Sequence, residues 1–117
     1  MTPTRIAIAG AGGRMGQALI EATLRSPDLA LAAALDIAGS PAIGRDAGER
    51  FGTPCGVPIG SDVDAAVRTA EVLIDFTRPE GTMAHLAVCR ERGVKAVIGT
   101  TGFSDTQKAE IAAHARH

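Results

Sequence analysis

The sequence predicts an α/β fold, a doubly wound parallel sheet with helices on both faces. Short apolar runs of strand length alternate along the chain with segments of helical periodicity, and this alternation favours right-handed crossovers between parallel strands. The 117 residues are 45% hydrophobic and 21% charged, which suits one packed domain and excludes disorder. We expect residues 1–117 to form a single domain with strand order 3-2-1-4-5 and a ligand crevice between the first and fourth strands.

The chain is expected to open with two strands joined by a helix. Residues 5–9 are an apolar run that ends in glycines, which is typical of a buried strand. Residues 15–25 place their apolar side chains mainly on one helical face, and the sequence Ser-Pro-Asp at residues 26–28 ends that helix. A second apolar run, residues 29–35, is terminated by Asp36.

A long loop is expected at residues 37–58, which hold Gly, Pro, Ser and charged residues without a clear period. We expect a helical turn near residues 46–51. A short edge strand is expected at residues 57–59, because an edge position tolerates Pro58.

The second half of the chain repeats the alternation of helices and strands. Pro79 suits the first position of a helix, Gly93 suits its terminator, and Ser104 with Gln107 has the spacing of a capping box. The expected elements are a helix from the N-cap Ser61 through residue 70, a strand at 72–76, a helix at 79–92, a strand at 95–98 and a helix from 105 to 117.

Charge and composition narrow the classes of partner. Twelve Lys and Arg against 13 Asp and Glu give a net charge of -1, and aromatic residues make up 3%, so we expect no nucleic-acid partner. No apolar run reaches the roughly 18 residues of a membrane span, and the start of the chain does not resemble a signal peptide. We therefore expect a cytoplasmic protein without a membrane partner. Cys55 and Cys89 lack metal-ligand spacing, and no metal site is expected. They could form a disulfide, but two buried free thiols are favoured for a cytoplasmic protein.

The loop after the first expected strand reads GAGGRMG at residues 10–16. Its last glycine comes one residue too late for GxGxxG, but Gly10, Gly13 and Gly16 fit GxxGxxG. Glycines in such a turn let backbone amides approach a pyrophosphate, and the N-terminus of the following helix adds partial positive charge. Arg14 adds a cation. The alternative is a turn that only lets the helix pack on the sheet.

Asp36 favours a dinucleotide site over that alternative. It ends the second expected strand 20 residues after Gly16, where a carboxylate accepts hydrogen bonds from the adenosine ribose in dinucleotide sites. An Asp that simply caps the strand end remains the other interpretation. No Walker-type lysine follows the glycines, which disfavours a P-loop nucleotidase.

Two further loops leave the carboxyl ends of expected strands, where such sheets bind their ligands. Residues 76–78 contain an arginine that either contacts an anion or is solvated. Residues 99–102 offer threonine hydroxyls to a carboxamide or ribose, although a structural turn fits equally well. Asp75 is expected to hold a neighbouring backbone amide. We assign no catalysis to the three histidines, His85, His114 and His117.

These motifs together resemble the N-terminal half of the 4-hydroxy-tetrahydrodipicolinate reductase (dihydrodipicolinate reductase) family. The resemblance lies in RIAIAGAGGRMG at residues 5–16, DFTRP at residues 75–79 and IGTTG at residues 98–102, with GRDAGE at residues 44–49 in support. It covers essentially the whole chain. The family reduces a cyclic hydroxy-dicarboxylate to tetrahydrodipicolinate with hydride from NADH or NADPH, a step of lysine and diaminopimelate biosynthesis. Its members are usually cytoplasmic homotetramers.

The resemblance implies a role for each of the three loops. Asp36 would hold the adenosine ribose of the cofactor. The pyrophosphate would be held by Gly10, Ala11, Gly12, Gly13, Arg14 and Met15. The nicotinamide end would be contacted by Gly99, Thr100 and Thr101, with Phe76, Thr77 and Arg78 beside it.

The chain departs from the family pattern in two places. It lacks the His-His-x-x-Lys motif of the family's substrate domain, so we expect a chain truncated before that domain, which binds dinucleotide weakly and does not turn over substrate. Many relatives have Arg directly after the ribose-binding acid, whereas this chain has Ile37, which predicts a preference for NADH or the use of both cofactors. The alternatives are the dinucleotide domain of another amino-acid dehydrogenase, of the aspartate or homoserine type, and a non-enzymatic nucleotide-sensing module.

Overall fold

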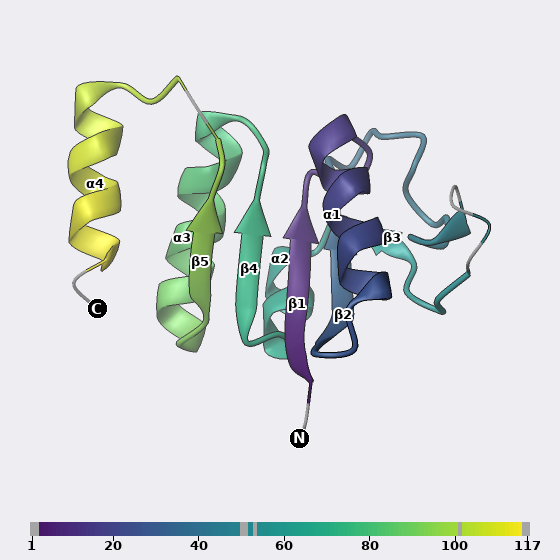
Figure 1. Ribbon diagram of the computed structural model, residues 1–117. Helices are drawn as coiled ribbons and strands as arrows, with labels where there is room; N and C mark the ends of the chain where they lie inside the picture. The colour runs from purple at the N-terminus through teal and green to yellow at the C-terminus, as the bar shows by residue number, and fades with distance from the viewer. Residues whose placement is uncertain (1–2, 50–51, 53, 101, 116–117) are drawn as a thin grey trace.

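A five-stranded parallel sheet forms the centre of the computed structural model, which describes residues 3–49, 52, 54–100 and 102–115 (Figure 1). The strands lie in the order β3-β2-β1-β4-β5, so the predicted order is confirmed. The strands are β1 (Thr4–Ala9), β2 (Leu29–Leu35), β3 (Ile59–Gly60), β4 (Val72–Asp75) and β5 (Lys95–Ile98). The helices are α1 (Arg14–Arg25), α2 (Val63–Arg68), α3 (Pro79–Arg92) and α4 (Asp105–Ala115).

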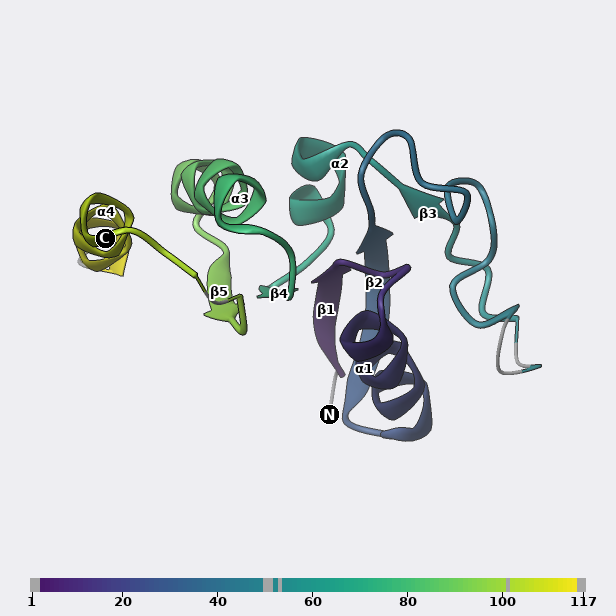
Figure 2. The ribbon, with the colours of Figure 1, turned by 90° about the horizontal axis from the view of Figure 1, so that it is seen from above.

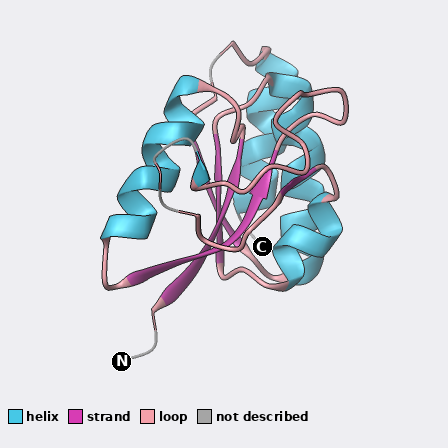
Figure 3. Cartoon of the chain, turned by 90° about the vertical axis from the view of Figure 1, so that its right-hand side faces the viewer, coloured by secondary structure: helices cyan, strands magenta, loops and turns pink. Residues whose placement is uncertain are grey.

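Helices cover both faces of the sheet, as a doubly wound fold requires. Seen from above, α1 lies on one face, over β1 and β2, and α2 and α3 lie on the other (Figure 2). The view along the sheet shows the same two helical layers with the twisted strands between them (Figure 3). Helix α4 packs beside α3 near the β5 edge. The predicted α/β fold class is confirmed.

Strand β1 lies at the centre of the sheet and faces both helical layers. Ile6 and Ile8 belong to the apolar core shared with α1, whereas Ala7 and Ala9 belong to the core shared with α2 and α3. Alternating side chains of a strand point to opposite faces, so a central strand must be apolar at every position. This requirement explains the unbroken apolar run in this part of the sequence.

Several predicted element ends are confirmed by their local chemistry. Pro79 begins α3, and Gly93 ends it in a left-handed conformation with φ of 71°, which glycine adopts without steric cost. The capping box before α4 is formed in both directions. The amide of Ser104 donates to Gln107 Oε1 at 2.8 Å, and the amide of Gln107 donates to Ser104 Oγ at 3.1 Å.

Other predicted ends were wrong by one or two residues. Asp62, not Ser61, is the N-cap of α2, because its Oδ1 accepts the amide of Ala65 at 3.1 Å. Helix α2 ends at Arg68 rather than at residue 70, and β4 ends at Asp75 rather than at Phe76. The edge strand β3 occupies Ile59–Gly60 rather than residues 57–59, and Pro58 instead forms an isolated antiparallel bridge with Asp46.

The loop at residues 37–58 contains a turn at the predicted helical position, where the amide of Glu49 donates to the carbonyl of Asp46 at 3.1 Å. Residues 50–51 of that prediction, and residues 116–117 at the predicted end of the last helix, lie outside the described part of the chain. No described helix has the length and apolar character needed to cross a membrane.

Native-state alkylation is expected to modify Cys55 and to spare Cys89. Both cysteines are free thiols, as predicted, but Cys55 is half-buried rather than buried, whereas Cys89 is only 2% exposed. Burial, with a smaller contribution from the charge of Asp75, raises the pKa of the Cys89 thiol to about 11, so the reactive thiolate is scarce near pH 8. Mass spectrometry of iodoacetamide-treated chain, with a urea-unfolded sample as reference, measures this. Equal labelling of the two cysteines in the native sample would contradict it.

Candidate functional site

A crevice of about 670 Å³ opens at the carboxyl ends of the strands, between β1 and β4. This is the position that the strand order predicts for a ligand site. Six of the predicted site residues line it: Gly10, Gly13, Asp36, Phe76, Thr77 and Arg78. Further lining residues include Ile37, Ser61, Glu80 and His85.

Most backbone amides of the turn between β1 and α1 already donate hydrogen bonds within the protein. Those of Gly10 and Ala11 donate to the carbonyl of Leu35 at 3.0 and 2.8 Å, and that of Gly13 donates to the carbonyl of Gly10 at 3.0 Å. The first amides of α1 have no carbonyl one turn back. No side chain in the described part of the chain caps this helix at its N-cap, Gly13.

The start of α1 therefore presents the free hydrogen-bond donors of the loop. The amides of Arg14 and Met15 lie there, at the positive end of the helix dipole, where an anion is stabilised. The side chains of both residues are exposed, and that of Arg14 forms no hydrogen bond or ion pair with another described residue. An anionic group is the ligand that this arrangement fits.

The loop glycines serve different purposes. Gly10 has φ of 92°, and a Cβ there would lie 2.5 Å from the carbonyl oxygen of Phe76. A Cβ on Gly16 would overlap the carbonyl of Gly10, and one on Gly12 would overlap the carboxylate of Asp36. Gly13 is different, because its nearest neighbour would be the carbonyl oxygen of Gly10 at 3.4 Å. Backbone packing requires glycine at Gly10 and Gly16, whereas at Gly12 the side chain of Asp36 would have to move, and Gly13 has room on the crevice side.

Asp36 lies directly beside the glycine-rich loop at residues 10–16. Its Oδ2 accepts the amide of Gly12 at 3.1 Å and the hydroxyl of Ser40 at 2.9 Å, while its Oδ1 accepts the amide of Ile37 at 2.9 Å. The carboxylate thus connects the ends of β1 and β2 at the crevice rim. Both interpretations of this residue, strand-end cap and ribose acceptor, remain consistent with these contacts.

The loops after β4 and β5 are joined through a cluster of hydroxyls. The amide of Thr77 donates to Thr100 Oγ1 at 3.0 Å, and Thr82 of α3 donates to the same oxygen at 2.8 Å. Thr82 is completely buried. Gly99 lies under the ring of Phe76, where a Cβ would overlap that ring. The structure thus brings Phe76, Thr77, Gly99 and Thr100 together as predicted, whereas Thr101 lies outside the described residues.

Asp75 anchors this cluster from the end of β4. Its Oδ1 accepts the amide of Thr77 at 3.0 Å and the hydroxyl of Thr77 at 2.6 Å, which confirms the predicted amide contact. Its Oδ2 lies 2.6 Å from Nδ1 of His85. Burial alone would raise the pKa of Asp75, but the hydrogen bonds from His85 and Thr77 outweigh it, so the pKa lies below its ordinary value.

Sequence reasoning missed the parts that α3 contributes. Thr82 and His85 are three residues apart on this helix and point to the same side, toward the β4 and β5 loops. That spacing was the available signal, but a Thr and a His on a helix are ordinary residues until the partner loops are located. Of these two residues His85 lines the crevice, whereas Thr82 is buried.

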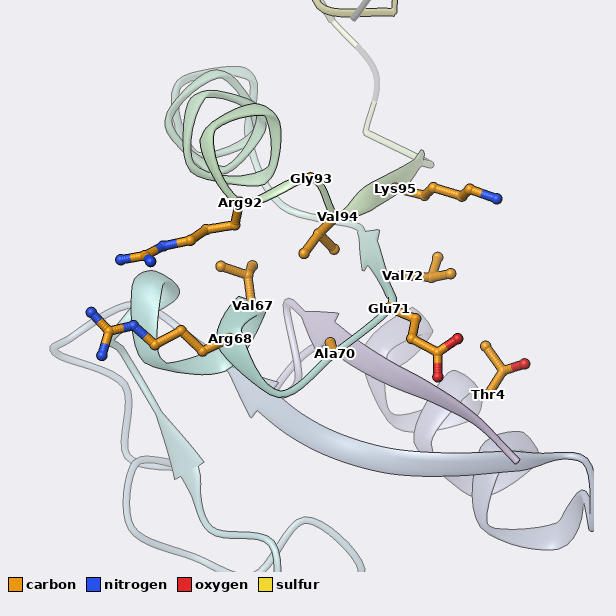
Figure 4. Close-up of a pocket in the computed structure, with 10 residues that line it drawn as sticks. All are labelled: Thr4, Val67, Arg68, Ala70, Glu71, Val72, Arg92, Gly93, Val94 and Lys95. Carbon is orange, nitrogen blue, oxygen red and sulfur yellow. The ribbon is translucent and has the colours of Figure 1, made fainter. Parts of the chain in front are cut away.

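A second hollow, of about 630 Å³, lies at the opposite ends of the strands (Figure 4). Three of its charged lining residues, Arg68, Glu71 and Arg92, form ion pairs with residues outside its lining. Arg68 and Arg92 both contact Asp64 at 2.9 Å, and Arg5 contacts Glu71 at 3.3 Å. None of the predicted site residues lies there, so the crevice at the carboxyl ends is the candidate site.

Comparisons with known proteins show the family of this chain. The model of the family "Dihydrodipicolinate reductase, N-terminus" matches residues 4–117. The 4-hydroxy-tetrahydrodipicolinate reductase of Nitrosospira multiformis is 56% identical over 111 residues, which are 95% of this chain and 41% of that protein. The enzyme of Bordetella pertussis is 61% identical over 110 residues, which are 94% of this chain and 40% of that protein. The chain thus spans about two fifths of the length of these curated relatives.

Solved structures show the same fold. A dipicolinate-bound dihydrodipicolinate reductase from Paenisporosarcina sp. TG-14 is 27% identical with a TM-score of 0.73, and the match covers 97% of this chain and 43% of that one. An amine dehydrogenase from Mycobacterium smegmatis reaches a TM-score of 0.74 at 22% identity, over 96% of this chain and 36% of that one, which shows the fold alone. On the family match over residues 4–117 and the identity to its curated members, this chain belongs to the N-terminal domain family of dihydrodipicolinate reductase.

Proposed function

We propose that this chain is the cofactor-binding part of an NAD(P)H-dependent 4-hydroxy-tetrahydrodipicolinate reductase, a cytoplasmic homotetramer that acts in lysine and diaminopimelate biosynthesis. The observation that carries the proposal is the uncapped start of α1 beside Asp36, in a crevice that the β4 and β5 loops also reach. The family's substrate, a small cyclic dicarboxylate, and its catalytic motif belong to the part of the relatives that this chain does not span.

In this proposal the three loops would bind different parts of the cofactor. The amides of Arg14 and Met15 and the guanidinium of Arg14 would bind the pyrophosphate, with Gly13 leaving room for it. Asp36 would accept the adenosine ribose. The nicotinamide end would be held by Phe76, Thr77, Arg78, Gly99, Thr100 and Thr101. When bound there, the cofactor supplies the hydride of the reduction.

Titration of the 117-residue chain with NADH, followed by amide NMR, tests this assignment. We expect weak, saturable binding, with the largest shifts at Gly13, Arg14 and Asp36, and no turnover of substrate in a coupled assay. Gly13→Ala should reduce the affinity at least about tenfold without loss of the folded spectrum, because its methyl group would occupy the phosphate position. Shifts confined to the hollow at the other end of the sheet would contradict the proposal, and so would turnover by a homogeneous sample.

The cofactor preference is expected to favour NADH or to allow both cofactors. A 2′-phosphate about 4 Å from Asp36 would cost roughly 4 kcal/mol at an effective dielectric near 20, and solvent at this rim screens much of it. The side chain of Ile37, 73% exposed at the crevice rim, offers no charge to offset the remainder. Arg45 lies further along the same loop but is 3.8 Å from Glu49, which competes for it.

Ile37→Arg is expected to shift preference toward NADPH about tenfold, which corresponds to about 1.4 kcal/mol. The guanidinium would form a bidentate contact with the 2′-phosphate. The measurement is the ratio of NADH and NADPH dissociation constants of this chain, and Ile37→Gln serves as the uncharged control of similar length. A strong NADPH preference in the unmutated chain would mean that another cationic side chain binds the 2′-phosphate.

A further inference from the structure

We propose that Ser40 sets the cofactor selectivity of this site, by competing for Asp36 with the ribose of NADH and by offering its hydroxyl to the 2′-phosphate of NADPH. The inference rests on the proposed function and deepens it. Ser40 is half-buried, and its hydroxyl donates to Asp36 Oδ2 at 2.9 Å. The same hydroxyl accepts the amide of Ala42 at 3.1 Å, which fixes Ser40 beside the carboxylate.

The hydrogen-bond capacity of Asp36 is nearly filled. A carboxylate offers about four acceptor positions. The amides of Gly12 and Ile37 and the hydroxyl of Ser40 occupy three of them. One position remains, whereas the adenosine ribose of NADH presents two hydroxyl donors. Full recognition of that ribose therefore requires one of the three donors to leave.

Ser40 is the donor that can leave. The amides of Gly12 and Ile37 are backbone groups, held by the turn after β1 and by the end of β2. The Ser40 hydroxyl rotates about a single bond, so it can release Asp36 while Ser40 stays in place. Its present contact thus competes with the second ribose hydroxyl of NADH.

The same rotation has the opposite consequence for NADPH. Its 2′-phosphate cannot donate to Asp36, but it can accept a hydrogen bond from a hydroxyl that has turned away from the carboxylate. Ile37 supplies no donor from its side chain at this rim. Ser40 therefore weakens binding of NADH by competition and strengthens binding of NADPH by donation.

Ser40→Ala is expected to shift the ratio of the NADPH and NADH dissociation constants about tenfold in favour of NADH. The change removes the hydroxyl that competes for Asp36 and also the donor to the 2′-phosphate, and both are hydrogen bonds to charged groups. The probes are NADH and NADPH, each titrated into the wild-type chain, Ser40→Ala and Ser40→Thr and followed by amide NMR. Ser40→Thr keeps the hydroxyl and should stay within about twofold of the wild-type ratio. A residue with a purely structural role would weaken both cofactors equally, so an unchanged ratio in Ser40→Ala would overturn the proposal. A shifted ratio in Ser40→Thr that matched Ser40→Ala would also overturn it.

A measurement on the wild-type chain keeps the test independent of variant folding. The amide signal of Ala42 reports the Ser40 hydroxyl through their hydrogen bond, and it should shift when either cofactor saturates the site. An unmoved Ala42 signal under saturation would overturn the inference while leaving the proposed function intact. Failure of both cofactors to bind the wild-type chain would instead reject the proposed function itself.

Discussion

Gly16→Ala is expected to lower the free energy of unfolding by about 3 kcal/mol. The new methyl group would overlap the carbonyl of Gly10 and lie 2.9 Å from the Cα of Ala11. Both neighbours are backbone of the turn after β1, so no flexible side chain can move aside. Gly10 is itself held in place, because its amide donates to the carbonyl of Leu35 and its carbonyl accepts the amide of Gly13.

Urea unfolding followed by circular dichroism measures the loss, and Gly13→Ala is the matched control. The control adds the same methyl group three residues earlier, where the nearest protein atom would be 3.4 Å away. It should cost less than about 1 kcal/mol of stability, the range for a change at a helix N-cap, and should act mainly on dinucleotide affinity. Equal destabilisation by the two variants, with unchanged affinity in Gly13→Ala, would mean that the glycines serve only helix packing.

The sequence predicted the strand order because its signals are local and repeated. Each signal determines the structure of residues close to it in the chain. These signals are the apolar runs, Pro79, Gly93 and the pair Ser104 and Gln107. The wrong start of α2 lies where two neighbouring residues suit the same role. Ser61 and Asp62 are both good N-caps, and only the geometry shows that Asp62 reaches the amide of Ala65.

The sequence predicts which loops form the site, but it does not predict the contacts between those loops. Gly12 and Asp36 are 24 residues apart, and Thr82 and Thr100 are 18 apart, so their contacts depend on how the sheet brings the loops together. The same contacts decide which donors stay free for a ligand. The glycine motif indicates amides along the whole loop, whereas the structure leaves free those at the start of α1.

Asp75→Ala is expected to lower the free energy of unfolding by about 3 kcal/mol or more, the usual range for removing one partner of a buried pair. Asp75 is 1% exposed, and the change removes the acceptor of the Thr77 amide, the Thr77 hydroxyl and the His85 ring. Water cannot easily replace it there. Asp64→Ala is the control, since Asp64 contacts two arginines but lies on the surface, where such pairs contribute little.

The pH dependence of unfolding distinguishes the contribution of the charge of Asp75 to stability from the contribution of its packing. Because its folded-state pKa lies below the ordinary value, ionised Asp75 stabilises the fold above the unfolded-state pKa of about 3.9, and this contribution is lost as the pH falls through the folded-state pKa. Urea unfolding of the wild-type chain should therefore show stability falling below about pH 5. Asp75→Ala should show a shallower fall, with a remainder from Asp46, whose pKa is lowered to about 2, chiefly by the amides of Cys55 and Gly48. Identical slopes in the two proteins would mean that the pKa of Asp75 is the same in the folded and unfolded states, which would contradict a stabilising role for its charge.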